Sequence, residues 1–367
     1  MVGGMKELAF EILNILDEFG YVGYIVGGYV RDMLLGIESH DIDITTNATP
    51  MELKEIFQQE ELINTGYGSV KLIYKNNPFE ITTFRKEDNY LDNRHPSSIT
   101  YVDDLTEDVL RRDFTINALC IDKDDNLIDL INGQEDLNNH ILKTIVDSNQ
   151  SFSSDALRIL RAIRFASLFD LQISNDINEA IKCNKHLLKN VSANRRKVEL
   201  DKIFGSGKAK EGIELIIQYD LSDVLELTNI SRVKDYSDIV GIWAMINTTS
   251  YNFTSSEKDL IEKVNIVYEM DNLDDFILYK YGVYVNILAG INKGLDKKEI
   301  IQKYEALPIK NRDEILISGD EIRNIMHIPQ GKIIGKIYTD LEDKILKREL
   351  INNKDEIVKY IMENNYV

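Results

Sequence analysis

The spacing of hydrophobic residues changes once along the chain and predicts two kinds of structure. Up to about residue 145, helical and period-two patterns are mixed. Helices are expected over residues 5–19, 30–35 and 50–57, and strands over 24–26, 40–45, 70–74 and 79–84. From residue 155 the pattern is helical almost to the end, and no run there predicts a strand. An α+β domain followed by an all-α region is therefore expected.

Polar and turn-forming segments separate these runs. A hairpin is predicted within residues 119–130, around a polar four-residue turn, and a second turn over 75–78. Residues 86–98 are polar and are expected to be irregular. In the helical region, residues 205–207 and 307–309 predict breaks, the second of them before a last helical unit.

The composition is that of a globular protein. The chain has 367 residues, of which 43% are hydrophobic and 29% charged, and this length suits two or three domains. No apolar run reaches the ~18–20 residues that a membrane span needs, and the N-terminus lacks the features of a secretory leader. Cys120 and Cys183 are too few for a disulfide framework or a zinc cluster, so a cytoplasmic location is expected.

The net charge of −19 argues against a protein that coats nucleic acid through bulk positive charge. Residues 151–210 differ from the rest, because they hold twelve Lys and Arg against six Asp and Glu. This basic segment could bind a polyanion locally, or it could form an ordinary solvated helix face.

Paired glycines follow the first predicted strand. Gly27 and Gly28 would let the backbone approach a phosphate, with Arg31 following on the next helix. The segment is not a P-loop, since no Gly-Lys-Ser/Thr follows, and it lacks the third glycine of a dinucleotide fingerprint. A simple turn is the alternative interpretation.

Three carboxylates lie on two predicted strands. The period-two pattern puts Asp41 and Asp43 on one face of a single strand, and Glu80 lies on a later strand between apolar neighbours. Oxygen ligands of this kind suit Mg²⁺ or Mn²⁺, and three carboxylates can hold two metals for in-line displacement at phosphorus. The alternative for Glu80 is an exposed strand residue.

Two groups of arginines are candidates for anion binding. Arg111 and Arg112 precede an apolar run, and Asp155, Arg158, Arg161 and Arg164 recur every three residues on one predicted helix. The competing interpretation in both cases is a set of surface ion pairs.

Taken together and in order, these motifs resemble class II tRNA nucleotidyltransferases, which include CCA-adding enzymes and bacterial poly(A) polymerases. The resemblance covers about residues 24–202 and continues weakly over 317–337. It implies a polymerase-β-type nucleotidyltransferase head over 1–148, then a helical neck over 149–210. A helical body over 211–305 and a tRNA-binding tail over 306–367 would complete the chain.

The resemblance also implies roles for individual residues. Catalysis is expected from Asp41, Asp43 and Glu80, with Asp41 and Asp43 as ligands of Mg²⁺ in a two-metal site, or of Mn²⁺. The residues expected to bind the nucleotide are Gly27, Gly28, Arg31, Arg112, Asp155, Arg158, Arg161 and Arg164. The partners would be tRNA, CTP and ATP, with neither DNA nor a membrane involved. Ser154 and Asn194 depart from the family, which usually has Glu at both positions.

Base selection has a simple chemical basis. Cytosine and adenine both present an amino donor beside a ring-nitrogen acceptor, whereas uracil and guanine present a carbonyl in place of the amino group. Asp155 could accept from the amino group and Arg158 could donate to the ring nitrogen, so that CTP and ATP are admitted without a template.

Three alternatives remain at this point. The chain could be a poly(A) polymerase, a partial enzyme that adds only CC or only A, or an inactive RNA- or nucleotide-binding homologue. The segment 87–96 resembles a flexible loop that CC-only members lack, and the chain has no basic C-terminal extension. Intact Asp41, Asp43 and Arg112 argue against an inactive protein. Outside the strand motif the sequence has no His-Asp pair of the metal-binding kind, so an added phosphohydrolase domain is not expected.

Overall fold

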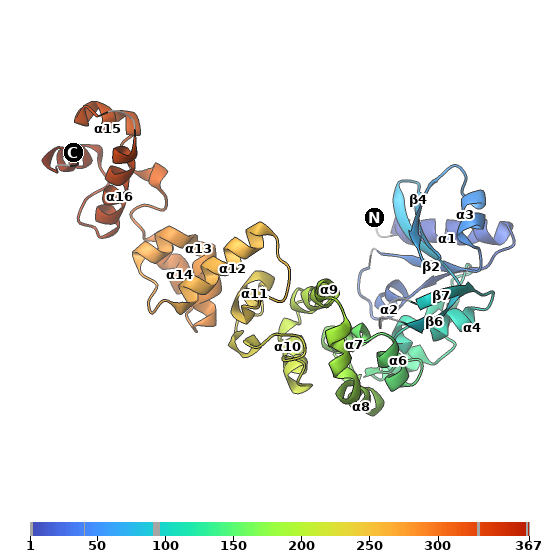
Figure 1. Cartoon of the computed structure of the whole chain (residues 1–367). Helices are drawn as coiled ribbons and strands as arrows, with labels where there is room; N and C mark the ends of the chain where they lie inside the picture. Colours follow the sequence, from blue (N-terminus) through green and yellow to red (C-terminus); the bar gives the residue numbers. More distant parts are fainter. Residues whose placement is uncertain (1–2, 40, 91–95, 329–330, 365, 367) are drawn as a thin grey trace. The chain divides into compact units, whose positions relative to one another are not determined.

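The computed structural model describes residues 3–39, 41–90, 96–328, 331–364 and 366. The chain divides into two compact units, residues 1–225 and 226–367 (Figure 1). The first unit contains all the strands and the helices up to α10 (Ala209–Gln218), and the second is helical. The mixed head followed by helices is therefore confirmed, whereas the finer division at residues 148, 210 and 305 stays a prediction.

A seven-stranded mixed sheet forms the centre of the head, in the order β3-β4-β5-β2-β1-β8-β9. Its strands are β1 (Gly23–Val26), β2 (Asp43–Thr46), β3 (Glu61–Gly66), β4 (Ser69–Tyr74), β5 (Asn77–Thr83), β8 (Cys120–Ile121) and β9 (Leu127–Ile128). Strand β2 lies between β1, to which it is antiparallel, and β5, to which it is parallel. Asp43 and Glu80 are partners in the parallel pair, so their side chains share one face of the sheet.

The predicted helices of the head are present. They are α1 (Gly3–Glu18), α2 (Gly28–Leu34) and α3 (Pro50–Ile56). The head also contains α4 (Leu105–Leu110) and α5 (Gly133–Asn138), which the hydrophobic pattern did not predict. Helix α1 buries Ile12, Leu13 and Leu16 and is followed by Gly20, whose φ of 83° suits a glycine after a helix end. The capping box of α3 joins Thr49 to Glu52.

Two details of the head differ from the sequence predictions. The strand expected over 40–45 begins only at Asp43, and residue 40 lies outside the described residues. The stretch 86–98, expected to be irregular, contributes to a two-stranded antiparallel ribbon of β6 (Arg85–Tyr90) and β7 (Pro96–Tyr101). Such a ribbon pairs through its backbone and needs no apolar face, so polarity alone did not reveal it. Residues 91–95 of the family-like loop lie outside the described residues.

Short helices follow the head within the first unit: α6 (Ser148–Ser154), α7 (Leu157–Phe169), α8 (Asn175–Asn184), α9 (Ala193–Phe204) and α10. The expected absence of strands after residue 155 is wrong in one place, because β11 (Gln172–Ile173) pairs in parallel with β10 (Ile141–Leu142). The predicted break at 205–207 separates α9 from α10.

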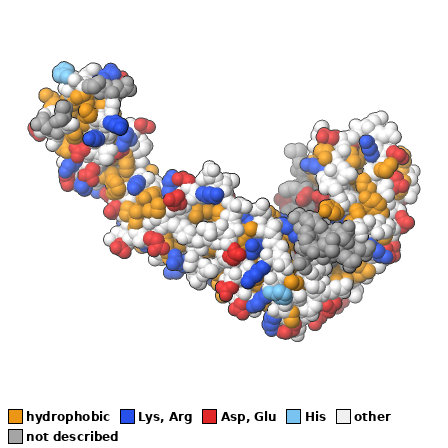
Figure 2. All heavy atoms as spheres, viewed as in Figure 1, with side chains coloured by type: hydrophobic (Ala, Val, Ile, Leu, Met, Phe, Trp, Pro, Cys, Tyr) orange, Lys and Arg blue, Asp and Glu red, His pale blue; other side chains and the backbone are white. Residues whose placement is uncertain are grey.

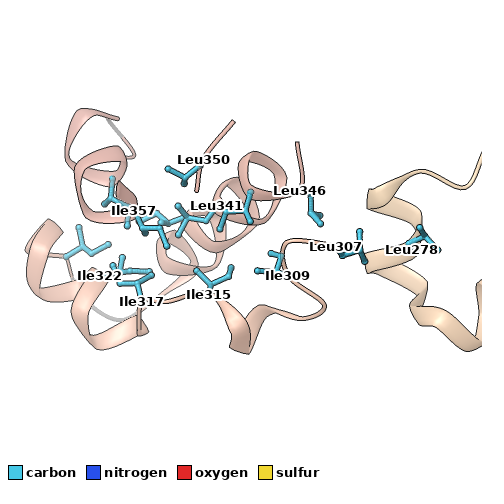
Figure 3. Close-up of a cluster of buried hydrophobic side chains, with 14 of the residues drawn as sticks. Leu278, Leu307, Ile309, Ile315, Ile317, Ile322, Leu341, Leu346, Leu350 and Ile357 are labelled. Carbon is cyan, nitrogen blue, oxygen red and sulfur yellow. The ribbon is translucent and has the colours of Figure 1, made fainter. Parts of the chain in front are cut away.

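The second unit contains α11 (Ile239–Ile246), α12 (Ser255–Glu269), α13 (Asp275–Asn292), α14 (Lys297–Glu305), α15 (Gly319–Met326), α16 (Lys332–Leu346) and α17 (Lys354–Glu363). A core of aliphatic side chains joins α13, the predicted break at 307–309 and α15 to α17 (Figure 3). Glu342 of α16 accepts hydrogen bonds from Tyr279 and Arg312, which ties α13 to α16. No helix among the described residues is long and apolar enough to cross a membrane.

Candidate active site

A cavity of about 710 Å³ in the first unit is lined by residues of both the head and the helices that follow it. Its wall contains nine cationic side chains and four carboxylates, so it suits a polyanion. The lining residues are Gly27, Gly28, Arg31, Asp41, Asp43, Tyr67, Arg85, Arg111, Arg112, Asp113, Asn117, Asp155, Arg158, Arg161, Arg164, Phe165, Arg195 and Lys202.

The carboxylates Asp41 and Asp43 both face this cavity, although only Asp43 belongs to β2. Burial raises the pKa of Asp43 to about 6, and the charges of Asp41 and Glu80 add to the increase. Glu80 therefore lies close enough to repel Asp43, but it is exposed and does not line the cavity.

The donor set fits a divalent cation. A bound cation would relieve the repulsion among these carboxylates, and carboxylate oxygens are the ligands that Mg²⁺ prefers. Among the residues that the structure describes, however, no three acidic, His or Cys side chains converge closely enough to form a complete metal cage. Any cation held here would depend on Asp41, Asp43 and oxygens supplied by a ligand.

The turn at Gly27 places the backbone beside one positive and one negative side chain of the site, those of Arg112 and Asp43. Gly27 has a φ of 78°, a conformation that side chains rarely adopt. A Cβ atom at Gly27 would lie 3.8 Å from Nη1 of Arg112 and 4.0 Å from Oδ2 of Asp43. The predicted turn is therefore present, and its role in phosphate binding stays a prediction.

A buried aspartate that the sequence analysis missed holds the two head arginines. Asp108 is fully buried and accepts hydrogen bonds from Arg111 (2.8 Å), Arg112 (3.0 Å) and Thr45 (3.2 Å). Burial raises its pKa, but Arg112 and Arg111 together hold it below the usual value. The available signal was its spacing, three and four residues before the arginines. Nε of Arg112 is buried and has no hydrogen-bond partner in the described structure.

Arg31 is more buried than a simple nucleotide contact requires. It donates to Asn117 and to Asp32, and its guanidinium lies 4.4 Å from the ring centroid of Phe169 and 5.1 Å from that of Phe165. These contacts connect α2 to α7 through cation–π interactions. Arg31 therefore joins the head to the neck as well as lining the cavity.

Asp113 makes a second connection between head and neck. Its carboxylate accepts from Arg161 of α7 (2.6 Å), from Asn117 (3.0 Å) and from the amide of Phe114 (2.8 Å). Burial opposes ionisation, but Arg161 and these hydrogen bonds hold the pKa of Asp113 at about 2.

Asp113→Asn is expected to destabilise the protein by about 2 kcal/mol at pH 7, since the folded pKa of about 2 lies below the ordinary 3.8. The stabilisation is fully present above pH 3.8 and is lost as the pH falls towards 2. Urea unfolding at several pH values measures this, with the exposed Asp124→Asn as control. An equal free energy of unfolding in wild type and Asp113→Asn at pH 7 would contradict the assignment.

The predicted neck residues reach the cavity from α7 and from the residue that ends α6. Asp155 lies between α6 and α7 with φ −135° and ψ 100°, so the prediction of one helix from Asp155 to Arg164 is wrong. Its Oδ1 accepts from the amide of Leu157 (3.0 Å), the first residue of α7, a local side-chain bond that competes with continuation of the helix. Its Oδ2 lies 3.6 Å from Nη2 of Arg195.

The three arginines of α7 have different partners. Arg158 contacts Ser151 and the carbonyl of Arg111, Arg161 binds Asp113, and Arg164 donates to Glu199 of α9 (2.8 Å). Arg161 and Arg164 form partly buried ion pairs at the cavity wall, whereas Arg158 is held there by uncharged acceptors, so the three do not form a solvated strip. Glu199 is a further site residue that the sequence analysis did not single out.

Three family models of known proteins match successive segments of the chain. A family model described as "Poly A polymerase head domain" matches residues 23–143. Models described as "Probable RNA and SrmB- binding site of polymerase A" and as tRNA nucleotidyltransferase domain 2 match residues 170–229 and 249–361.

Curated relatives cover nearly all of the chain. The CCA-adding enzyme of Staphylococcus haemolyticus is 33% identical, over 97% of this chain and 97% of the relative. That of Ligilactobacillus salivarius is 32% identical, over 96% of this chain and 95% of the relative. The chain belongs to the CCA-adding enzyme family. A crystal structure of the Bacillus stearothermophilus CCA-adding enzyme in complex with CTP has a TM-score of 0.81 at 25% identity, and covers 97% of this chain and 96% of that one.

Membership in the CCA-adding enzyme family extends the resemblance beyond residue 202, where the sequence motifs became weak. It also confirms the expected nucleotidyltransferase head. The hydroxyl of Ser154 donates to the carbonyl of Ser151 (2.8 Å) within α6.

The cations of the basic segment 151–210 divide into two sets. Arg158, Arg161, Arg164, Arg195 and Lys202 line the cavity. Others lie away from it: Lys182 pairs with Glu179 (2.7 Å) and Lys185 donates to the carbonyl of Tyr219 (3.2 Å). On the visible face in Figure 2, acidic and basic side chains are interspersed.

Proposed function

We propose that this protein, as a CCA-adding enzyme, adds C, C and A to the 3′ end of tRNA with the cavity of the first unit as its nucleotide site. The 3′-hydroxyl of tRNA attacks the α-phosphate of CTP or ATP, the new O3′–P bond forms, and pyrophosphate leaves. The observation that carries the residue roles is one cavity that brings together Asp41 and Asp43, a wall of arginines, and the neck residues Asp155 and Arg158.

Asp41 and Asp43 would hold the divalent cation, Mg²⁺ or Mn²⁺, with Glu80 as a neighbouring carboxylate. When bound, such cations neutralise developing charge and activate the attacking hydroxyl. The raised pKa of Asp43 supports this role, since an uncompensated carboxylate cluster binds a cation readily.

The triphosphate would lie against the arginine wall. Arg112 has a buried Nε without a partner in the described structure, and the open backbone at Gly27 and Gly28 lies beside it. Asp108 keeps Arg112 in this position. Arg31, Arg161 and Arg164 are held by protein partners and supply positive potential to the same space.

Asp155 and Arg158 would recognise the base from the neck. Both line the cavity, and neither belongs to the element that carries Asp43. The base and the reacting phosphate would therefore be held by separate elements, which allows the same chemistry on CTP and ATP.

The poly(A) polymerase alternative is distinguished by the product. A tRNA that lacks its terminal CCA is incubated with ATP alone and with CTP plus ATP. The CCA-adding function predicts no long extension with ATP alone and three added nucleotides with both. Long adenylate tails with ATP alone would indicate a poly(A) polymerase, and a product that stops after two cytidines would indicate a partial enzyme.

The tRNA is expected to contact the helical parts, the predicted neck, body and tail, through its shape and backbone rather than its sequence. The enzyme is expected to act in the cytoplasm, where tRNA is matured.

Reversing a surface cation of the basic segment tests this contact. Lys182→Glu is expected to raise the KM for tRNA a few-fold, and the effect should grow as salt is lowered, while the KM for CTP stays unchanged. Lys182 is preferred to Lys185, whose contact with Tyr219 also supports the fold. Lys75→Glu in the β4–β5 turn is the control. If the KM for tRNA does not change, this face of α8 does not contact tRNA.

A further inference from the structure

Two contacts fix the guanidinium of Arg158 at the cavity wall. Nη1 donates to the hydroxyl of Ser151 (2.8 Å), and Nη2 donates to the backbone carbonyl of Arg111 (2.7 Å). Ser151 lies in α6 and Arg111 lies at the end of α4, so elements before and after the head–neck junction hold the same side chain. A guanidinium has five N–H donors, and these two bonds leave donors for a ligand in the cavity.

Ser151 suits a fixed positioning role. Its side chain is only 1% exposed, and its backbone is held in α6 through the bond from its amide to the carbonyl of Asp147 (2.8 Å). The hydroxyl therefore lies at a defined place, whereas a long arginine side chain would otherwise sample many rotamers. The Arg111 carbonyl alone would leave the guanidinium free to rotate about a single contact.

We infer that Ser151 is a positioning residue for base selection and acts by orienting Arg158 towards the base of the incoming nucleotide. The inference rests on the proposed role of Arg158. A bidentate-type polar contact discriminates between bases only when both partners have the correct geometry. A loosely held arginine could reach the carbonyl of uracil or guanine as well as the ring nitrogen of cytosine or adenine.

Ser151 differs from the other serines of α6 in the group that its hydroxyl contacts. Ser153 is exposed and its hydroxyl donates to the carbonyl of Gln150 (3.1 Å), while Ser154 donates to the carbonyl of Ser151. Ser151 provides the hydroxyl that meets Arg158, so removal of different hydroxyls in the same helix should have different effects on fidelity.

The test compares Ser151→Ala, Ser151→Cys and Ser151→Thr with wild type, with Ser153→Ala as the matched control. The ratio of UMP to CMP incorporation is measured on tRNA lacking CCA, alongside a melting curve. Ser151→Ala and Ser151→Cys are expected to raise the ratio about tenfold, because each replaces a good hydrogen-bond acceptor. Ser151→Thr should restore it to near the wild-type value, and Ser153→Ala should leave it unchanged. The cysteine variant keeps the side-chain volume if the alanine variant folds poorly.

Arg158→Ala separates failure of this inference from failure of the proposed function. If Arg158→Ala raises the ratio and Ser151→Ala raises it no further in that background, Ser151 acts through Arg158. If Arg158→Ala raises the ratio but Ser151→Ala and Ser151→Cys do not, the positioning inference is wrong while the role of Arg158 stands. If Arg158→Ala leaves the ratio unchanged, the proposed base recognition itself is wrong, and the inference falls with it.

Discussion

Replacing Asp41 or Asp43 by alanine is expected to abolish the incorporation of both CMP and AMP. Each change removes one of the two carboxylates proposed to hold the cation, and in the described part of the chain no cluster of three acidic, His or Cys side chains could hold a metal instead. Catalysis of phosphoryl transfer depends on cation-assisted charge stabilisation, so the loss should exceed about a hundredfold. The measurement is the single-turnover rate with saturating CTP or ATP and Mg²⁺.

Asp124→Ala, in the exposed turn between β8 and β9, is the control for the loss of an acidic residue of the head. Melting curves should show that Asp41→Ala and Asp43→Ala remain folded, and Asp43→Ala should be no less stable, since the charge it removes is repelled by its neighbours. More than about a tenth of the wild-type rate in either variant, a barrier change below roughly 1.4 kcal/mol, would refute the metal assignment.

Truncating Asp155 or Arg158 is expected to relax the choice of base while catalysis persists. Each residue supplies one half of a contact worth roughly 1–3 kcal/mol of discrimination, so UTP and GTP should compete about tenfold better or more in the alanine variants. The carboxylates Asp41 and Asp43 are untouched, so nucleotide transfer should continue at a reduced rate. The ratio of CMP to UMP incorporation at saturating Mg²⁺ measures the effect.

Asp155 also has a structural contact, which the experiment must separate from base recognition. Because its Oδ1 accepts from the amide of Leu157 at the start of α7, Asp155→Ala should lower stability by about 1 kcal/mol. Asp155→Asn keeps an oxygen that can accept from this amide but loses the charge that faces Arg195, and should be more stable than Asp155→Ala. If Asp155→Ala lowers the melting temperature and leaves the CMP to UMP ratio at its wild-type value, the residue only holds the neck.

Local sequence patterns were sufficient to predict those turns and strands whose backbone conformation is determined by one short segment. The Gly27 turn, the alternation of Ile42 and Ile44 with Asp41 and Asp43, and the hairpin around residues 123–126 are set by neighbours in sequence. These predictions were confirmed, except that the strand begins at Asp43. Ordered motifs of a known family then predicted the nucleotidyltransferase class.

The features that the sequence did not predict have two origins. Some depend on contacts between residues far apart in the chain, and others on competition between a side chain and the helical backbone within a few residues. The link from Arg31 to Phe169 and that from Arg161 to Asp113 span more than 45 residues, and no periodicity reports them. The helix break at Asp155 was missed because the apolar spacing continues through it, while its carboxylate accepts from the nearby amide of Leu157. Asp108 resembled an ordinary helix charge until its complete burial was visible.

The central claim is that a single cavity binds both CTP and ATP and recognises the feature that their bases share, an amino donor beside a ring-nitrogen acceptor. Equilibrium binding of labelled CTP to the full-length protein, with unlabelled ATP or UTP as competitor, tests it most directly. One CTP should bind per chain, ATP should displace it completely, UTP should compete at least about tenfold less well, and Arg112→Ala should weaken both CTP and ATP. Two independent nucleotide sites, or equal competition by UTP and ATP, would contradict the account.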